Sequence, residues 1–369
     1  MTVRSGPDAV GVKGAVIALI PVVVALGVAS LLVLLVGENP IEAFRLIIEG
    51  SLGSPDKASD TVMVWVPLTL AAAGLVVTFA AGLWNIGVEG QIALGAIGAA
   101  LIAREVPAPA IILVPPTLVF GVLFGIVWAL FAGVLKTHGK VNEIFGGLGL
   151  DFVATGLTIY LIIGPWARPG IASTSGTEPC PEAAWLPSVG DTRFSPIAVT
   201  LAIIAVIGVW LLLRGTRFGL KLKAVGRNTQ SSYLLGIPTN RYMLGAFAIC
   251  GGLAGLAGAI QATGFHYKLV PSSSGGYGFL GILVVLLAGY RAALVAPISA
   301  FFAIVAVGSI TLTLRLDVDS ALGAVLTGVL VLFALLGTGF RSYRARKRTD
   351  AIAAGADDAS DTSAPAAGA

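Results

Sequence analysis

Long apolar stretches separated by short polar ones dominate the pattern of residues along this chain. A membrane-spanning helix needs about 20 predominantly apolar residues, and about ten stretches approach that length. They cover residues 14–36, 61–83, 86–103, 110–135, 144–164, 196–213, 242–263, 277–289, 294–313 and 320–338. The pattern predicts an all-α, polytopic transmembrane helical bundle of about ten spans. Stretch 277–289 is short for a span, and 86–103 is rich in Gly and polar residues.

The composition supports lipid as the solvent for much of the surface. Hydrophobic residues make up 56% of the chain and charged residues only 11%, whereas a typical soluble domain carries about 25% charged residues. So few charges cannot cover a globule of this size in water. The 48 glycines fit the same picture, because small residues let membrane helices approach closely.

The distribution of Lys and Arg predicts the orientation. With the N-terminus placed in the cytoplasm and the sides alternated, 16 of the 23 basic residues fall on the cytoplasmic side. Cytoplasmic loops of membrane proteins carry an excess of Lys and Arg. We therefore expect an even number of spans with both termini in the cytoplasm, and we assign the net charge of +4 to topology instead of nucleic-acid binding.

The same pattern gives the domain organisation. The first apolar stretch is longer than the roughly 7–15-residue core of a signal peptide, so we interpret it as a retained span. No segment is large enough to form a soluble enzyme domain. We expect a cytoplasmic N-terminus (1–13), one transmembrane domain (14–341) with external loops 37–60 and 165–195 and a main cytoplasmic loop 214–241, and a disordered cytoplasmic tail (342–369).

A polar cluster interrupts two apolar stretches at Asn85, Glu89 and Gln91, between which lie Gly87 and Gly90. Such side chains are costly when they face lipid. The glycines permit a break after which a half-helix begins, and its free N–H groups and positive dipole end are suited to polar contacts. Two interpretations are open: the cluster lines a transport pathway or a hinge beside it, or it is a polar clamp that only holds the bundle together.

The loop 214–241 predicts a short cytoplasmic helix. Asn228 is a good N-cap, Gly236 a typical helix stop and Pro238 a block to continuation. A short helix flanked by basic residues is suited to dock into a partner's groove. The alternative is that the basic residues only satisfy topology and contact lipid headgroups.

Two further features, a set of glycines and a pair of aromatic residues, can be explained by helix packing or by position in the membrane. Gly251, Gly255 and Ala259 form small-xxx-small pairs, as do Gly121 and Gly125, which indicates close helix packing. Tyr277 and Phe279 follow a flexible Ser/Gly segment; they either stack on a planar ligand or lie at the membrane interface.

The sequence lacks the residue patterns of nucleotide binding, a disulfide and a metal site. The string from Gly133 to Val141 has the wrong spacing for a nucleotide-binding P-loop and lacks its Ser or Thr. Cys180 and Cys250 fall in different environments, so we expect no disulfide. The histidines, His138 and His266, are isolated, and no metal-ligand spacing occurs.

The string Asn85-Ile-Gly-Val-Glu-Gly-Gln91 resembles the signature of nucleoside and simple-sugar ABC uptake permeases, within the larger group of ribose and branched-chain amino acid permeases. The resemblance extends over most of the chain. It includes Gly37-Glu-Asn-Pro40, Pro67-Leu68, Gly95-Ala96, Ala224-Val-Gly226-Arg-Asn228, Gly236-Ile237 and Gly276-Tyr-Gly-Phe279-Leu-Gly281-Ile282. The segment Ala288–Ala293 departs from the family, which carries Gly and Asn-Pro there.

This resemblance implies a permease subunit in a bacterial cell membrane, not an enzyme. Its implied partners are a second homologous permease, ABC ATPase subunits that bind ATP and Mg, and an extracellular substrate-binding lipoprotein or soluble binding protein; no cofactor is expected on this chain. The implied translocation-pathway residues are Asn85, Glu89, Gln91, Tyr277 and Phe279. The implied ATPase-coupling residues are Gly226, Arg227, Asn228, Tyr233, Gly236 and Ile237.

The nucleoside branch of the family implies a purine or pyrimidine nucleoside as cargo, with ribose-like sugars as the alternative. An ion-coupled secondary transporter is a rival, although only Glu89 and Asp151 are candidates for its ion or proton site. A membrane-embedded enzyme would need clustered acids, bases or metal ligands, which this sequence does not present. A structural scaffold gives no reason for the intramembrane Asn-Glu-Gln group.

Overall fold

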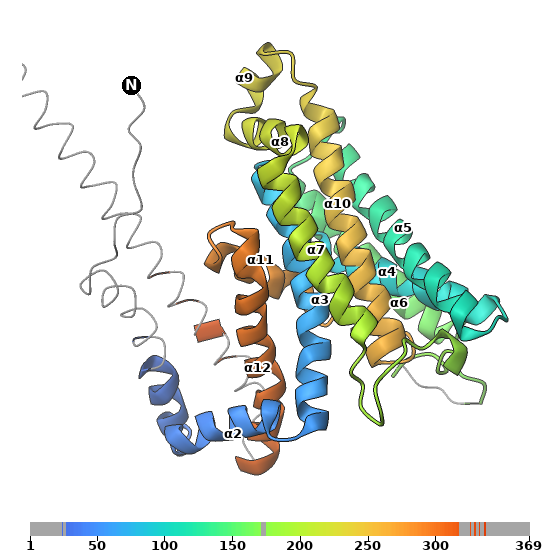
Figure 1. The fold of residues 1–369 in the computed structure, drawn as a ribbon, viewed down its shortest axis with the longest axis vertical. Helices are drawn as coiled ribbons and strands as arrows, with labels where there is room; N and C mark the ends of the chain where they lie inside the picture. The colour runs from blue at the N-terminus through green and yellow to red at the C-terminus, as the bar shows by residue number, and fades with distance from the viewer. Residues whose placement is uncertain are drawn as a thin grey trace, which may run out of the picture. The chain divides into compact units, whose positions relative to one another are not determined.

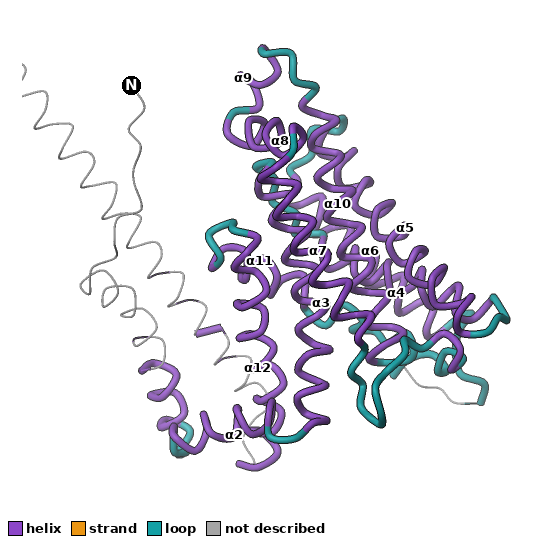
Figure 2. Tube along the Cα trace, viewed as in Figure 1, coloured by secondary structure: helices purple, strands orange, loops and turns teal. Residues whose placement is uncertain are grey.

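The computed structural model describes residues 24, 27–170 and 175–316, together with 325, 328, 329, 332 and 336. Over these residues the chain is helical, and no strand occurs among them (Figure 2). The helices are α2 (Pro40–Leu52), α3 (Pro55–Ala80), α4 (Val88–Glu105), α5 (Ala110–Thr137), α6 (Glu143–Ile163), α7 (Pro196–Gly215), α8 (Arg217–Arg227), α9 (Thr229–Leu234), α10 (Thr239–Ile260), α11 (Tyr277–Leu287) and α12 (Ala292–Leu316), with a 3₁₀ turn at Glu182–Ala184 and a π-helical turn at Gln261–Phe265.

The chain divides into two units. The larger unit, Arg45–Asp317, holds every site residue discussed below. The smaller unit combines Met1–Phe44 with Val318–Ala369, and its described part includes a helical stretch at 27–35. The predicted N-terminal segment 1–13 and tail 342–369 lie outside the described residues.

The prediction of an all-α, polytopic membrane bundle is confirmed. Among the described residues, six helices are long and apolar enough to cross a membrane: α3, α5, α6, α7, α12, and α10 together with its π-helical turn. The short helix α11 matches the predicted 277–289 segment, and α4 matches 86–103. Most of the expected first and last spans, 14–36 and 320–338, lies outside the described residues, so the count of ten stays a prediction.

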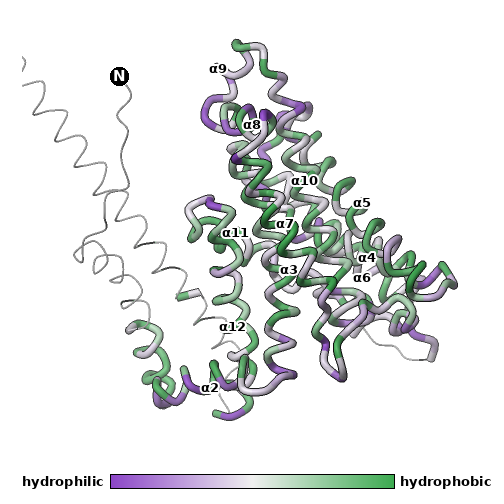
Figure 3. Tube along the Cα trace, in the orientation of Figure 1, coloured by the Kyte–Doolittle hydropathy of each residue, from purple (hydrophilic) through white to green (hydrophobic). Residues whose placement is uncertain are grey.

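The helices of the larger unit lie side by side around α3, α4 and α10 (Figure 1). Hydrophilic residues gather in α8 and α9 at one end of α7 and in the loops at the opposite end, whereas α5 and α7 are mostly hydrophobic (Figure 3). Ile111, Phe152, Ile204 and other large apolar side chains on α5, α6 and α7 are exposed in the isolated chain, as expected of a surface that faces lipid.

Helix α3 begins at Pro55, earlier than the apolar stretch 61–83 indicates. The sequence pattern placed the first external connection at 37–60, yet α2 occupies much of it and α3 begins at Pro55. Ser54 caps α3 by accepting a hydrogen bond from the Lys57 N–H at 3.3 Å, and Pro55 occupies the first helical turn. Both residues are favoured at helix starts, so local capping extends the helix beyond the apolar residues.

Glycine contacts hold the centre of the bundle. A Cβ added at Gly95 of α4 or at Gly125 of α5 would collide with the backbone of Gly251 or Gly255 in α10. A Cβ at Gly121 would lie 2.5 Å from that of Ala259. The predicted small-residue packing face of α10 is therefore confirmed, and it brings three helices to backbone contact.

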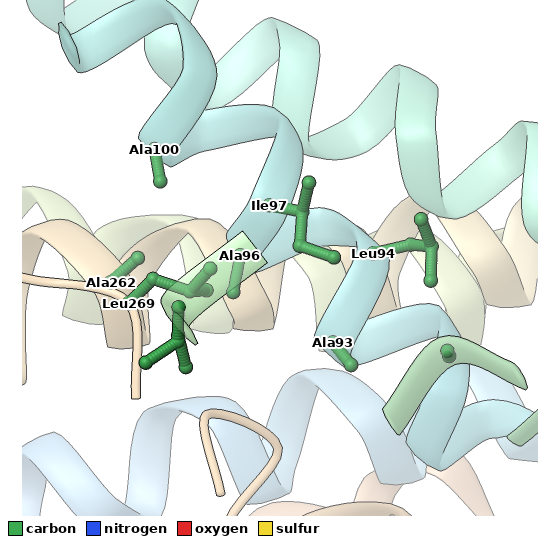
Figure 4. Close-up of a cluster of buried hydrophobic side chains, with 9 residues drawn as sticks. Ala93, Leu94, Ala96, Ile97, Ala100, Ala262 and Leu269 are labelled. Atoms are coloured by element: carbon green, nitrogen blue, oxygen red, sulfur yellow. The ribbon is translucent and has the colours of Figure 1, made fainter. Parts of the chain in front are cut away.

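Small apolar side chains continue this packing along α4. Ala96 and Ala100 are fully buried and belong to a cluster with Ala262 and Leu269, which follow α10 (Figure 4). Phe124 and Trp128 from α5 and Trp166 from the loop after α6 cover the cluster. The alternation of small and large residues lets the helices approach while the space between them stays filled.

The predicted external loop 165–195 is folded against the end of α10. The Thr177 N–H donates to the Leu269 carbonyl at 2.9 Å, and the Cys180 N–H donates to the Tyr267 carbonyl at 2.7 Å. Cys180 and Cys250 are both free thiols, as predicted. Burial raises the pKa of the Cys180 thiol to about 11, which disfavours the reactive thiolate form.

We predict that Gly255→Ala lowers the thermal stability of the detergent-solubilised protein, because overpacking a tight interior costs about 1–3 kcal/mol. The matched control is Gly156→Ala on α6, where an added Cβ meets no atom within 4 Å. Since Ala is favoured over Gly inside a helix by roughly 0.5–1 kcal/mol, the control should be neutral or slightly stabilising. Equal melting temperatures for the two variants would contradict the packing described here.

Candidate translocation and coupling site

The candidate site is built at a break between α3 and α4. α3 ends at Ala80, and Gly82 takes a left-handed conformation with φ +73°. The chain turns through residues 81–87 before α4 begins at Val88. The predicted helix break at this polar cluster is confirmed, and it places Glu89 in the first turn of α4, where a negative charge is favoured.

Asn85 and Gln91 pair with each other across the start of α4. The Asn85 Nδ2 donates to Gln91 Oε1 at 3.1 Å, and the Gln91 Nε2 donates to Asn85 Oδ1 at 3.0 Å. Asn85 Nδ2 also lies 3.2 Å from the sulfur of Cys250 on α10. Both amides are buried, and this reciprocal pairing satisfies groups that would be costly in an apolar interior.

The Glu89 carboxylate binds the N-terminus of α11. Its two oxygens accept hydrogen bonds from the backbone N–H groups of Gly276, at 2.8 Å, and Gly278, at 2.7 Å. The first N–H groups of a helix have no partner within the helix. Glu89 is only 7% exposed, so it caps α11 from a position 187 residues earlier in the chain and also opposes the positive end of the helix dipole.

The glycines at this contact are required by its geometry. Gly276 has φ +73°, which L-residues with a side chain rarely adopt. A Cβ on Gly278 would lie 2.6 Å from Glu89 Oε2 and 2.7 Å from the Glu89 backbone nitrogen. The carboxylate can therefore reach the helix end only because both positions are glycine.

The length of α11 explains why its start lies inside the bundle. Its 11 residues rise about 16 Å, roughly half of the 30 Å hydrocarbon thickness of a bilayer. Residues 267 and 269 bond to the loop at 165–195, whereas Gly276 and Gly278 contact Glu89. The segment between them brings a half-helix N-terminus to an interior position, as in transporters with broken helices.

The two predicted aromatic residues have different surroundings. Tyr277 is 8% exposed, and Phe279, two residues later, is 43% exposed. Tyr277 lies close enough to Gln261 to interact with it electrostatically. Gln261 opens the π-helical turn and is fully buried, and neither of its side-chain polar atoms makes a hydrogen bond of normal geometry. π-turns within helices occur mostly at functional sites.

The predicted coupling segment forms two helices. Thr216 caps α8 by accepting from the Gly219 N–H at 3.0 Å, and Asn228 caps α9 by accepting from the Ser231 N–H at 2.9 Å. α9 ends at Leu234, and Gly236 follows with φ +78°. The predicted cap and stop are confirmed.

The exposed tip of this segment is apolar. On and beside α9, Tyr233 is 70% exposed, Leu234 is 79% exposed and Leu235 is 80% exposed. Figure 1 shows α9 at the end of the larger unit, beyond α8. These neighbouring exposed apolar side chains are a candidate surface for a partner.

Gly226 joins the coupling segment to the helix break. A Cβ at Gly226 would collide with the carbonyl of Ala80 and lie 2.9 Å from the Gly82 nitrogen. The last turn of α8 therefore touches the backbone at the end of α3. That contact lies three residues before Asn85 and seven before Glu89 in the chain.

The structure brings most of the predicted residues into two connected groups. Asn85, Glu89, Gln91 and Tyr277 surround the start of α4 and α11, while Arg227, Asn228, Tyr233, Gly236 and Ile237 follow Gly226 on the exposed side. Sequence reasoning missed the partners Cys250, Gly276 and Gly278, and it missed Gln261. A glutamine within the apolar stretch 242–263 was a visible signal for the last.

Comparison with known proteins identifies the family. Residues 58–335 match the family described as the branched-chain amino acid transport system / permease component. This chain belongs to that family of ABC transporter permeases. The resemblance found in the sequence is therefore confirmed, and the chain is a membrane transport subunit.

The permease has curated relatives with different named cargoes. The glucose ABC transporter permease protein TsgB13 of Haloferax volcanii is 29% identical and aligns over 88% of this chain and 87% of its own length. The guanosine ABC transporter permease protein NupP of Bacillus subtilis is 26% identical over 85% and 91%, respectively. The nucleoside ABC transporter permease protein NupB of Lactococcus lactis is 27% identical over 73% and 77%.

We predict that Glu89→Ala reduces transport while the permease still inserts and assembles. The substitution leaves the half-buried N–H of Gly276 and the buried N–H of Gly278 without this acceptor, and an unsatisfied buried donor costs about 1–3 kcal/mol. Uptake should fall in cells whose membranes contain normal amounts of the variant, measured by immunoblot. Glu89→Gln retains one acceptor oxygen and should lie between Ala and the wild type. Full uptake by the Ala variant would remove this contact from the transport mechanism.

Proposed function

We propose that this permease forms the translocation pathway of an ATP-driven importer of nucleosides. The observation that supports it best is the chain of contacts from the exposed α9 tip through Gly226 to the helix break, and from Glu89 to α11. A signal from a cytoplasmic partner reaches the start of two interior helices through the backbone contact at Gly226 and then through the side chain of Glu89. A transport subunit driven by an external motor needs such a connection between two conformations.

We assign the pathway to the neighbourhood of α4 and α11. Phe279 supplies exposed aromatic surface that is suited to stacking on a planar base. Asn85, Glu89, Gln91 and Tyr277 hold the helices behind that surface and, with Gln261, offer polar groups when the helices move. Tight cargo binding is unnecessary, because the permease only has to alternate between two packings of similar energy.

We assign ATPase coupling to α9 and its flanks, residues Gly226, Arg227, Asn228, Tyr233, Gly236 and Ile237. The apolar side chains at the tip match a hydrophobic groove, and the basic residues beside them favour an acidic rim. Because Gly226 touches the end of α3, a push on α9 is transmitted to the helix break without passing through flexible side chains.

The remaining parts of the proposal follow from the family and the sequence. The permease spans a bacterial plasma membrane about ten times with both termini in the cytoplasm, as one domain over 14–341. It pairs with a second homologous permease. Separate ABC ATPase subunits bind ATP and Mg, and an extracellular binding protein delivers the cargo, so this chain itself carries no cofactor.

A sugar is the second candidate cargo. The relative named for glucose has a slightly higher identity to this chain than the relatives named for guanosine and nucleosides. We favour nucleosides because the site pairs aromatic with amide side chains. Amides hydrogen-bond the edges of bases, and aromatic rings stack on their faces.

The test is uptake of labelled guanosine, ribose and glucose by cells that carry the whole transporter, with and without this chain. We expect loss of guanosine uptake alone when the chain is deleted. Loss of sugar uptake alone would retain the permease and replace the cargo.

One further arm separates transport from coupling. Cells complemented with Leu234→Asp, which places a charge at the exposed α9 tip, should retain the permease in the membrane but lose both uptake and co-purification of the ATPase. The matched control Leu220→Asp changes a leucine on α8 that is 71% exposed. If the two variants behave alike, the docking surface lies elsewhere than α9.

A further inference from the structure

A basic pocket borders α8, and the contacts described above do not account for the positive charge gathered in it. It has a volume of about 730 Å³ and is lined by the end of α3, the last turns of α7 and α8, and the turn between α11 and α12. Four basic side chains from three of these elements converge on it: Arg214, Lys223, Arg227 and Arg291. Among the described residues that line it, none is Asp or Glu.

The positive charge of this pocket is not neutralised by the described part of the chain. None of the four basic residues is ion-paired there; the ion pairs found elsewhere join Lys136 to Glu143 and Arg193 to Asp60. Lys223 Nζ donates to the Leu213 carbonyl at 2.7 Å, which fixes its position without neutralising it. Four cations at one concave surface create a strong field for an anion.

Aromatic side chains line the pocket beside the four basic residues. The Arg214 guanidinium lies 5.3 Å from the ring centre of Trp210, and Phe79 packs edge-on to Tyr290 with ring centres 5.6 Å apart. Tyr290 takes φ +62°. A bulky residue rarely adopts this conformation, and such outliers cluster at ligand sites.

The pocket opens beside a lipid-facing helix. Trp210 and Arg214 occupy the end of α7, which is long and apolar enough to span a membrane. Towards the centre of that helix, Ile203, Ile204 and Ile207 are 47%, 59% and 50% exposed. A ligand with its anionic group in the pocket can therefore lay an apolar chain along α7.

We propose that this pocket binds the phosphate headgroup of an anionic phospholipid, with its acyl chains on α7. Basic pockets between transmembrane helices on the cytoplasmic side recognise such headgroups. The adjoining apolar face favours a lipid over free phosphate, and Trp and Tyr, which line the pocket, are the residue types enriched where membrane proteins meet headgroups. Since Gly226 and Arg227 line the pocket, the bound lipid would rest against the coupling segment.

The test is a titration of phosphatidylglycerol into phosphatidylcholine nanodiscs that hold the assembled transporter, with bound lipid counted by native mass spectrometry. The pocket variant is Arg214→Gln/Arg291→Gln. Each basic residue near an anionic surface contributes about fivefold to binding, so this variant should bind roughly 25-fold more weakly. The matched control, Arg217→Gln/Lys221→Gln, removes the same charge from α8 outside the pocket and should bind like the wild type.

A charge-preserving variant and a competition with phosphate serve as two further controls. Arg214→Lys/Arg291→Lys preserves the charge and should retain the lipid, which separates lost charge from lost folding. Inorganic phosphate in excess should fail to displace the lipid. The proposal would be overturned if the pocket and control variants lost lipid equally, or if the Gln pocket variant retained the lipid. Displacement of the lipid by phosphate would overturn it too. So would a Gln pocket variant that retains the lipid but loses the ATPase subunit.

Discussion

A helix that starts inside a membrane protein exposes backbone N–H groups that water does not reach, and the organisation of this permease depends on how they are satisfied. Unpaired backbone groups cost several kcal/mol in an apolar environment. The N–H groups of Gly276 and Gly278 find their acceptor in Glu89, a side chain from another helix. One carboxylate thus stabilises a broken helix and ties two distant parts of the chain together.

The residues next to Glu89 support this contact by holding the turn that precedes it. Asn85 and Gln91 fix the turn that precedes Glu89, and Gly226 of α8 presses on the backbone where that turn begins. In the proposed mechanism, these contacts carry motion of α8 and α9 to α11. Elsewhere in the bundle, glycines bring α4, α5 and α10 to backbone contact.

The sequence predicted the elements better than their connections. Apolar length and caps such as Asn228 were sufficient to place most of the long helices, α9 and the break near Gly87, because these signals are local, whereas α2 and α8 were not predicted. The role of Glu89 was left open between a pathway group and a clamp. Its hydrogen-bond partners lie 187 and 189 residues away, and no local pattern specifies which distant backbone a buried carboxylate meets.

The pocket beside α7 was hidden for the same reason. In the sequence alone, Arg214 and Arg291 are each explained by membrane topology, since each follows an apolar stretch. Only the packing of α7, α8 and the α11–α12 turn brings them together. The start of α3 also differed from the apolar pattern, because a polar cap at Ser54 extended the helix beyond it.

The most direct test of this account is hydrogen–deuterium exchange over residues 274–280 in the assembled transporter, compared between wild type and Glu89→Ala. If Glu89 holds the start of α11, the variant should exchange roughly 5–150-fold faster there, as expected from a loss of about 1–3 kcal/mol. The α10 segment Gly251–Ala259 should be unchanged. Equal protection of residues 274–280 in both proteins would contradict the central role of this contact.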